Sequence, residues 1–200
     1  MQKKKVKFSG VKEYLDVKAT PLKPAAGRIL ISVPFYNDPF FNRTVVLLVE
    51  CSENNCVGLI INQQIKFKIN QIIKDIDIDE HIYAGGPVMH NNAFGLHNYP
   101  YCEDCSEIVK NVYLGYNDRL ISILEKRFDS SVKYKFFIGY SGWAPNQLEE
   151  EIHHQMWVVS RADEQLILHT PPDLIWEHAV KELGNEYLHW LKIPVHLSDN

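Results

Sequence analysis

The segment from Gly139 to Ile152 is the part of the sequence that most restricts what the chain can fold into. An apolar, β-type run, Tyr134 to Ile138, leads into it, and a second such run follows it. Two glycines flank Ser141, and glycine adopts backbone angles that other residues resist, so we expect a tight turn. Asn146 then predicts the N-cap of a helix, since Glu149 three residues later completes a capping-box pattern.

Length and composition indicate one globular domain. The chain has 200 residues, of which 46% are hydrophobic and 12% aromatic, which is enough for a substantial core. No apolar run reaches the ~18 residues of a membrane span. The first residues, Met1 to Lys7, lack the apolar segment of a secretory signal. We therefore expect a soluble, cytoplasmic protein that does not associate with membranes.

Charge divides the chain into a basic N-terminal extension, residues 1–24, and an acidic domain, residues 25–200. The extension carries seven lysines against two acids, whereas 14 basic residues face 23 acidic ones in the remainder. Affinity for a phosphate backbone comes chiefly from cations, so this balance argues against direct nucleic-acid binding. We interpret the extension as a solvated tail with one short helix around residues 11–18. Contact of its lysines with nucleic acid or an acidic surface is the alternative.

Strand and helix patterns alternate without a regular βαβ order. Besides the two runs around the central segment, strands are predicted at residues 29–33, 44–49, 57–61, 81–83, 94–97 and 109–114, the second and third forming a hairpin. Helices are predicted to start at the caps Asn70, Asn117 and Thr170. Residues 166–168 form a further apolar run. This mixture favours an α+β domain with largely antiparallel pairing.

Four sequence blocks carry a resemblance to a known family. They are residues 34–38 with Phe41, Arg43, Thr44 and Val45; residues 58–62; residues 83–88; and residues 139–152 with Trp157. With these blocks the chain, from about residue 27 to residue 168, resembles the AlgH (YqgE-like) family of bacterial proteins. The resemblance implies a single α+β domain with a bifurcated, partly closed, mostly antiparallel β-sheet (a pseudo-barrel) and helices packed around it. It also brings a proposed role in transcriptional regulation, without established catalytic residues.

The predicted working surface is a groove formed by polar and aromatic positions of these blocks. Its candidate binding residues are Asp38, Phe41, Arg43, Asn62, Gly85, Gly86, Ser141, Trp143 and Gln147. We expect it to bind a protein or small-molecule partner without catalysis, with regulation as the consequence; the oligomeric state stays open. The alternative is architectural: Asp38 and Arg43 can form a buried ion pair. Likewise, the glycine pair can form a structural turn instead of an anion-binding loop.

A hydrolase that uses Ser141, Asp38 and the cleft near Trp143 is the second functional hypothesis. A serine between a strand and a helix is typical of the nucleophile elbow, whose pattern is Gly-x-Ser-x-Gly. Here Trp143 occupies the place of the second glycine, so the motif fails. A turn serine that bonds backbone groups is the simpler interpretation.

The four cysteines form two closely spaced pairs, Cys51 with Cys56 and Cys102 with Cys105. Together with His97 they make a zinc site conceivable. A redox pair is opposed by Glu103 and Asp104, because nearby acids disfavour a thiolate. We therefore expect free thiols and predict neither a metal nor a cofactor.

Overall fold

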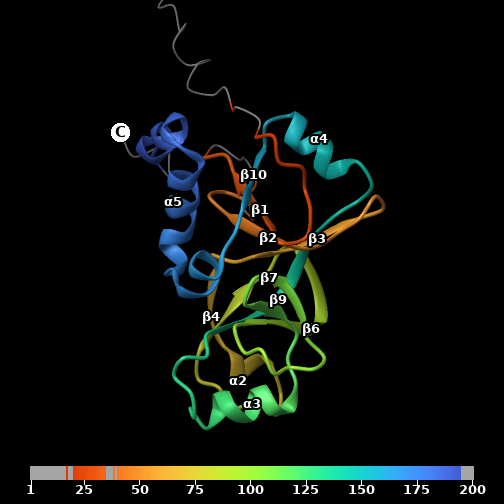
Figure 1. Ribbon diagram of the computed structural model, residues 1–200, viewed down its shortest axis with the longest axis vertical. Helices are drawn as coiled ribbons and strands as arrows, with labels where there is room; N and C mark the ends of the chain where they lie inside the picture. Colours follow the sequence, from red (N-terminus) through yellow and green to blue (C-terminus); the bar gives the residue numbers. More distant parts are fainter. Residues whose placement is uncertain (1–16, 18–19, 35–37, 39, 195–200) are drawn as a thin grey trace, which may run out of the picture.

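A long central strand, β9 (Tyr134–Trp143), connects the two halves of a curled sheet (Figure 1). Its first residues pair with β6 (Val88–His97) and, in parallel, with β5 (His81–Ala84). Its last three residues, Ser141 to Trp143, pair with β3 (Cys56–Ile60) in the other half. The computed structural model describes residues 17, 20–34, 38 and 40–194.

The other strands extend the sheet on both sides of β9. The strand order is β10-β1-β2-β3-β9-β6-β8-β7, and β4 joins the sheet through β5. The bounds of these strands are β1 (Arg28–Ser32), β2 (Val45–Cys51), β4 (Gln64–Lys68), β7 (Ser106–Val109), β8 (Val112–Leu114) and β10 (Trp157–Arg161). The predicted hairpin is confirmed, because β2 and β3 pair antiparallel.

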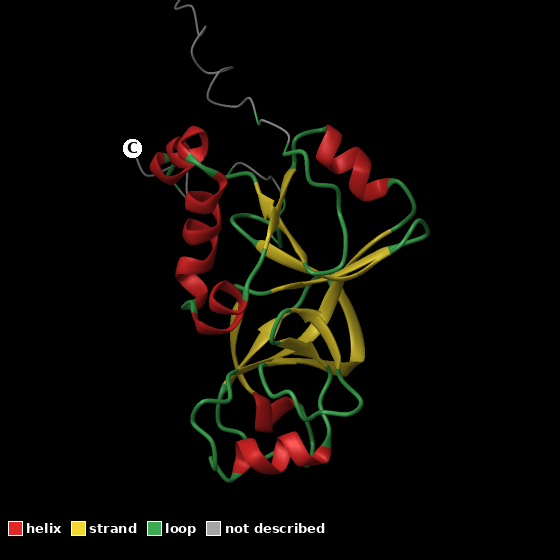
Figure 2. Cartoon of the chain, in the orientation of Figure 1, coloured by secondary structure: helices red, strands yellow, loops and turns green. Residues whose placement is uncertain are grey.

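Helices cover the sheet and close three hydrophobic clusters (Figure 2). Their bounds are α2 (Ile69–Ile72), α3 (Asp118–Glu125), α4 (Gln147–His153), the π-helix η1 (Gln165–His169), α5 (Pro172–Leu183) and the 3-10 helix η2 (Asn185–Lys192). Helix α5 buries Trp176 and Ala179 against β1 and β2, and α3 packs near Phe136. Helix α4 lies over the cluster that holds Trp143 and Trp157. The predicted α+β class with a partly closed, mostly antiparallel sheet is confirmed.

The tight turn predicted between Gly139 and Gly142 is wrong, because β9 continues through both glycines. The strand is stabilised there by pairing with β3, which satisfies backbone groups that a turn would expose. The chain turns only after Trp143. Asn146 has a left-handed backbone (φ 63°), and its side chain caps no amide. Instead, the Gln147 side chain accepts a hydrogen bond of 3.0 Å from the amide of Ala144.

Other boundaries differ from the sequence expectations for local reasons. The single strand expected at residues 109–114 is the hairpin of β7 and β8, which turns at Asn111 (φ 63°). Lys68, and not Asn70, precedes α2, and Pro171, and not Thr170, precedes α5. The cap at Asn117 is confirmed, since its side chain accepts a 3.0 Å hydrogen bond from the amide of Leu120.

The apolar run at residues 166–168 belongs to the π-helix η1, which the sequence pattern did not indicate. Strand β4 was also missed. Its five residues alternate between polar and apolar side chains, which was a usable strand signal, but its pairing partner β5 lies more than ten residues further along the chain.

The described end of the N-terminal extension lies against the sheet. The hydroxyl of Thr20 donates a 2.7 Å hydrogen bond to the carbonyl of Val159 in β10, and Leu22 packs on the cluster around Trp157. The helix predicted at residues 11–18 falls outside the described residues, apart from Val17. Among the described helices, none is long and apolar enough to cross a membrane.

Candidate functional site

The central segment of the sequence builds a carboxylate-centred cluster. Glu151 of α4 accepts hydrogen bonds of 2.8 Å from the indole nitrogens of both Trp143 and Trp157 through the same oxygen, Oε2. Its second oxygen accepts a 2.9 Å hydrogen bond from Gln147. Both indoles are buried, so this carboxylate pairs two donors that water does not reach.

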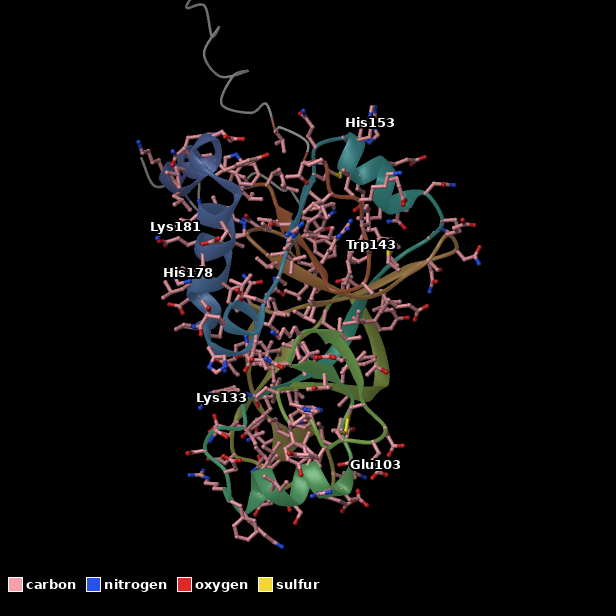
Figure 3. All side chains as sticks on the ribbon, in the orientation of Figure 1. Glu103, Lys133, Trp143, His153, His178 and Lys181 are labelled. Carbon is pink, nitrogen blue, oxygen red and sulfur yellow. A yellow bond between two sulfur atoms is a disulfide. The ribbon has the colours of Figure 1, made fainter. Side chains whose placement is uncertain are left out.

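Aromatic packing fills the space beside this cluster. The Phe41 ring lies 5.3 Å from Trp157 and 6.5 Å from Trp143, and the two indoles lie 6.2 Å apart, all measured between ring centroids. Trp143 is only 4% exposed, and Figure 3 shows it within the fold. The structure thus brings three of the predicted binding residues, Phe41, Trp143 and Gln147, together as a packed cluster.

Ser141 lies inside β9 and is 1% exposed. Its hydroxyl donates a 3.3 Å hydrogen bond to the carbonyl of Gly85, which is its only side-chain hydrogen bond among the described residues. The nucleophilic interpretation of Ser141 therefore lacks both access and a general base.

Gly85 and Gly86 pack directly on β9. A Cβ at Gly86 would lie 2.3 Å from the carbonyl carbon of Tyr140, and one at Gly85 would lie 2.3 Å from the carbonyl oxygen of Gly139. The backbone of Gly85 also links two strands, donating to Ile138 and accepting from Ile60. These contacts match the structural interpretation of the glycine pair.

Asp38 and Arg43 do not form the ion pair considered from the sequence. Asp38 accepts a 2.8 Å hydrogen bond from the amide of Phe40. The Arg43 guanidinium lies 4.8 Å above the Trp176 ring and donates to the carbonyl of Ile193. Arg43 therefore connects the loop before β2 with the C-terminal helices, a contact that local sequence does not reveal.

Asn62 closes the end of the β2–β3 hairpin. Its side-chain amide donates a 2.9 Å hydrogen bond to the carbonyl of Arg43, and its side-chain oxygen accepts one of 2.9 Å from the amide of Val45. Both bonds satisfy backbone groups, so this polar side chain has a clear architectural role.

A cavity lies away from these residues, between β10, η1 and α5. Its volume is about 740 Å³. The apolar part of its lining is buried or half-buried and comprises Leu22, Ile29, Ala162, Leu166 and Ala179. The exposed part is charged or polar and includes Arg161, Asp163, His178, Lys181 and Glu182. Figure 3 labels His178 and Lys181 on α5, the helix that forms one wall.

A second cavity, of about 190 Å³, contains a buried lysine. Lys135 is 5% exposed, and its ammonium donates a 3.1 Å hydrogen bond to the carbonyl of Ile61 and lies 5.0 Å from the Tyr83 ring centroid. Burial lowers the pKa of Lys135 to about 7. Burial, with a smaller effect of Glu80, raises the pKa of Tyr83 to about 12. Perturbed groups of this kind concentrate at functional sites, although structural networks produce them too.

The cysteines are paired as disulfides, so the expectation of free thiols is wrong. Cys51 and Cys56 face each other across the β2–β3 hairpin. Cys102 and Cys105 close a short loop, with Cα atoms 5.3 Å apart. The tight turns bring each pair within bonding distance, a constraint that spacing alone does not settle. His97 lies beside the second pair, and these three residues could jointly face a metal ion.

The AlgH-like family model matches residues 29–188, which is most of the chain. The chain belongs to the AlgH-like family. A UPF0301 protein of Bacteroides thetaiotaomicron is 34% identical over 185 residues, covering 91% of this chain and 94% of that protein. A UPF0301 protein of Parabacteroides distasonis is 34% identical over 192 residues, covering 94% and 97%. The resemblance inferred from the sequence blocks is thereby confirmed.

Solved structures agree with the AlgH-like fold. The solution structure of the AlgH protein from Pseudomonas aeruginosa matches with a TM-score of 0.68 and 24% identity, covering 90% of this chain and all of that one. A crystal structure of a Corynebacterium diphtheriae protein matches with a TM-score of 0.71 and 18% identity, covering 87% and 94%. At these identities the likeness concerns the fold alone.

Sequence reasoning missed two residues of this AlgH-like chain that organise its interior. Glu151 follows Leu148 by three positions and precedes Ile152, so it lies on the apolar face of α4, which was a usable signal. Lys135 stands within an apolar strand and faces inward, but only the strand register decides that. Both residues are polar groups whose role depends on what surrounds them.

Proposed function

We propose that this protein binds a small amphipathic anion in the 740 Å³ cavity between β10, η1 and α5. Ligand sites in proteins are concave, mostly apolar and of roughly 300–1,000 Å³, with a few polar groups that orient the ligand. The volume and the mixed lining of this cavity match that description. The ligand class is an apolar body that carries one carboxylate or phosphate.

The observation that carries this proposal is the guanidinium of Arg161, which lies at an apolar cavity and has no bonding partner among the described residues. Among the described residues, the exposed Arg161 makes no hydrogen bond or ion pair through its side chain. Of the three other charged residues of the lining, Lys181 pairs with Glu177, Asp163 accepts a 2.8 Å hydrogen bond from the amide of Leu166, and Glu182 is exposed to solvent. A guanidinium binds carboxylates and phosphates through two parallel hydrogen bonds, so Arg161 is suited to hold the anionic group.

The apolar floor supports an organic body instead of a bare inorganic anion. Ile29 and Ala179 are each 1% exposed, and they lie beside the half-buried Leu22, Ala162 and Leu166. Each methylene group that a ligand buries there contributes about 0.8 kcal/mol. A ligand of this class thus combines one charged contact with burial of its hydrocarbon part.

We propose this location in preference to the groove predicted beside Trp143. Phe41, Trp143 and Gln147 are committed to the cluster around Glu151, and Ser141 is buried in β9. The hydrolase hypothesis finds no support in this geometry. The family resemblance suggests a role in regulation, and this role stays a prediction. Binding to a protein partner also stays a prediction.

A thermal-unfolding screen with octanoate and phenyl phosphate tests the proposal. We expect a ligand at about 100 times its dissociation constant to stabilise the wild-type protein by roughly 2.7 kcal/mol. Arg161→Ala should lose most of this stabilisation, because the anionic group then lacks its partner. The control is Lys110→Ala, which removes an exposed cation in the turn between β7 and β8. Equal stabilisation of Arg161→Ala, or no stabilisation of the wild type by either compound, would overturn the proposal.

A further inference from the structure

A second site lies at the opposite end of the molecule from α4, in the loop between β6 and β7. It consists of the Cys102–Cys105 disulfide and His97, the last residue of β6. The ligand atoms of these three residues lie within 4.8 Å of one another. In Figure 3, the labelled Glu103 lies beside a bond between two sulfur atoms.

The imidazole of His97 faces the sulfur of Cys105. Nε2 lies 3.4 Å from Sγ of Cys105, and the ring is held by stacking on Tyr113 at 5.8 Å. His97 is 1% exposed, and burial lowers its pKa to about 4. The ring is therefore neutral at neutral pH and carries a single proton.

A backbone hydrogen bond decides which nitrogen carries that proton. The amide of Tyr99 donates a 3.1 Å hydrogen bond to Nδ1 of His97. An amide nitrogen only donates, so Nδ1 acts as the acceptor and is unprotonated. The proton of the neutral ring then resides on Nε2, which points it at the sulfur of Cys105.

This tautomer favours thiolate chemistry over metal binding. A metal requires an imidazole nitrogen with a free lone pair. Here the Nδ1 lone pair is taken by the amide of Tyr99, and Nε2 bears the hydrogen. An N–H donor at 3.4 Å instead stabilises negative charge on Sγ, and a stabilised thiolate is the reactive form of cysteine.

The two sulfurs differ in access. Cys102 is 6% exposed, whereas Cys105 is half-buried and follows the exposed Glu103 and Asp104. These carboxylates oppose a thiolate, but they are solvated and their effect is screened. Gly115 allows the close approach of Cys105, since a Cβ there would lie 3.2 Å from Sγ.

We propose that Cys102 and Cys105 form a redox-active couple that undergoes thiol–disulfide exchange with a dithiol or disulfide substrate, with Cys105 as the reacting sulfur. In the reduced protein, the Cys105 thiolate attacks a substrate disulfide, forms a mixed disulfide and releases one substrate thiol. Cys102 then loses its proton and attacks Sγ of Cys105, which releases the second substrate thiol and closes the protein disulfide. The protein loses two electrons and two protons, and the substrate disulfide gains them.

The wild-type protein offers an internal control, because its other disulfide lacks a nearby histidine donor among the described residues. On treatment with dithiothreitol, we expect Cys102–Cys105 to be reduced at least about tenfold faster than Cys51–Cys56. Mass spectrometry of alkylated peptides separates the two pairs. Equal rates, or slower reduction of Cys102–Cys105, would overturn the proposal.

Trapping identifies the reacting sulfur. The reduced Cys102→Ser protein, treated with glutathione disulfide, should accumulate a mixed disulfide at Cys105, since the resolving thiol is gone. Cys105→Ser should not accumulate one at Cys102. The reverse pattern contradicts the assignment, and circular dichroism establishes that both variants are folded.

The role of His97 is tested by the pH profile of alkylation. In the reduced wild type, iodoacetamide should react with Cys105 with a midpoint below the usual thiol pKa of about 8.5. His97→Phe keeps a ring against Tyr113 but removes the N–H, so the midpoint should rise toward about 8.5. The charged and titratable groups around this sulfur are His97, Glu103, Asp104, Tyr99, Tyr113 and the Arg119 above Tyr99. A midpoint that His97→Phe leaves unchanged would contradict the proposal.

Binding of Zn²⁺ to the reduced protein is a further measurement that can overturn the proposal. If the reduced wild type binds one equivalent of Zn²⁺ tightly, and both His97→Phe and Cys105→Ser abolish that binding, the site is a metal site. The exchange proposal then fails.

Discussion

Glu151→Ala is expected to destabilise the fold by roughly 3 to 5 kcal/mol, because it leaves two buried indole N–H groups without an acceptor. In the wild type, Oε2 of Glu151 accepts from both Trp143 and Trp157, and Oε1 accepts from Gln147. Each unpaired buried donor costs about 1–3 kcal/mol, and bonds to a charged acceptor lie at the upper end. Urea unfolding followed by tryptophan fluorescence measures the loss.

The matched control is Glu150→Ala, one position earlier on the same helix. Glu150 is exposed, so its removal should change the free energy of unfolding by no more than about 0.5 kcal/mol. A substitution to glutamine at position 151 gives a second test. Its neutral oxygen can still accept from the indoles, but its amide would face the Gln147 amide, so we expect an intermediate loss. If Glu151→Ala costs no more than Glu150→Ala, the carboxylate does not organise this cluster.

The wild-type protein is expected to gain stability relative to Lys135→Met as pH rises from about 7 to 10.5. Burial lowers the pKa of Lys135 from 10.5 to about 7, so between these values the unfolded chain binds the proton that the folded chain has released. The free energy of unfolding then rises with pH by about 1.4 kcal/mol per pH unit. Relative to Lys135→Met, the wild-type protein is most stable above pH 10.5. This relative stability decreases as the pH falls from 10.5 and is fully lost below about pH 7. The expected relative change from pH 7 to pH 10 is on the order of 4 kcal/mol.

Urea unfolding of both proteins at several pH values measures this difference, and other titrating groups largely cancel. Lys135→Met leaves the other titratable residues of the cavity unchanged, namely Glu80, His81, Tyr83, Lys133 and Tyr134. Lys133→Met serves as the control, because Lys133 is exposed and, among the described residues, its ammonium bonds only the carbonyl of Ser130. Its stability should parallel that of the wild type. A Lys135→Met curve that also runs parallel to the wild type would show that the lysine keeps its ordinary affinity for the proton.

Much of the secondary structure could be predicted because its signals are local. Continuous runs of apolar and β-branched residues indicated β2 and β3, and Asn117 capped α3 as expected. The turn at Gly139 to Gly142 was predicted wrongly because a long-range contact decided the structure there. Glycine permits a turn without requiring one, and pairing with β3, some 80 residues earlier in the chain, decided for a continuous strand.

The candidate sites show the same difference between local sequence signals and long-range contacts. Trp143 and Gln147 were identified from the sequence, but the acceptor that unites them, Glu151, was interpreted as one of several acids near a helix start. An ion pair of Arg43 with Asp38 was considered because both are polar residues beside apolar strands, whereas the contacts of Arg43 in the fold are Trp176 and Ile193. The cavity of about 740 Å³ draws its lining from distant stretches of the chain, within residues 22–29, 160–170 and 178–182, and no motif marks it.

Sequence alone determined the family, the α+β class and the identity of most strands, since these depend on residue blocks and on hydrophobic periodicity along the chain. Only the tertiary structure decided which polar groups are withdrawn from water, and with what partners. Lys135 acquires its lowered pKa, and His97 its single proton on Nε2, from groups that folding brings around them. Desolvation and hydrogen bonding depend on the whole three-dimensional environment, so no local pattern in the sequence encodes them.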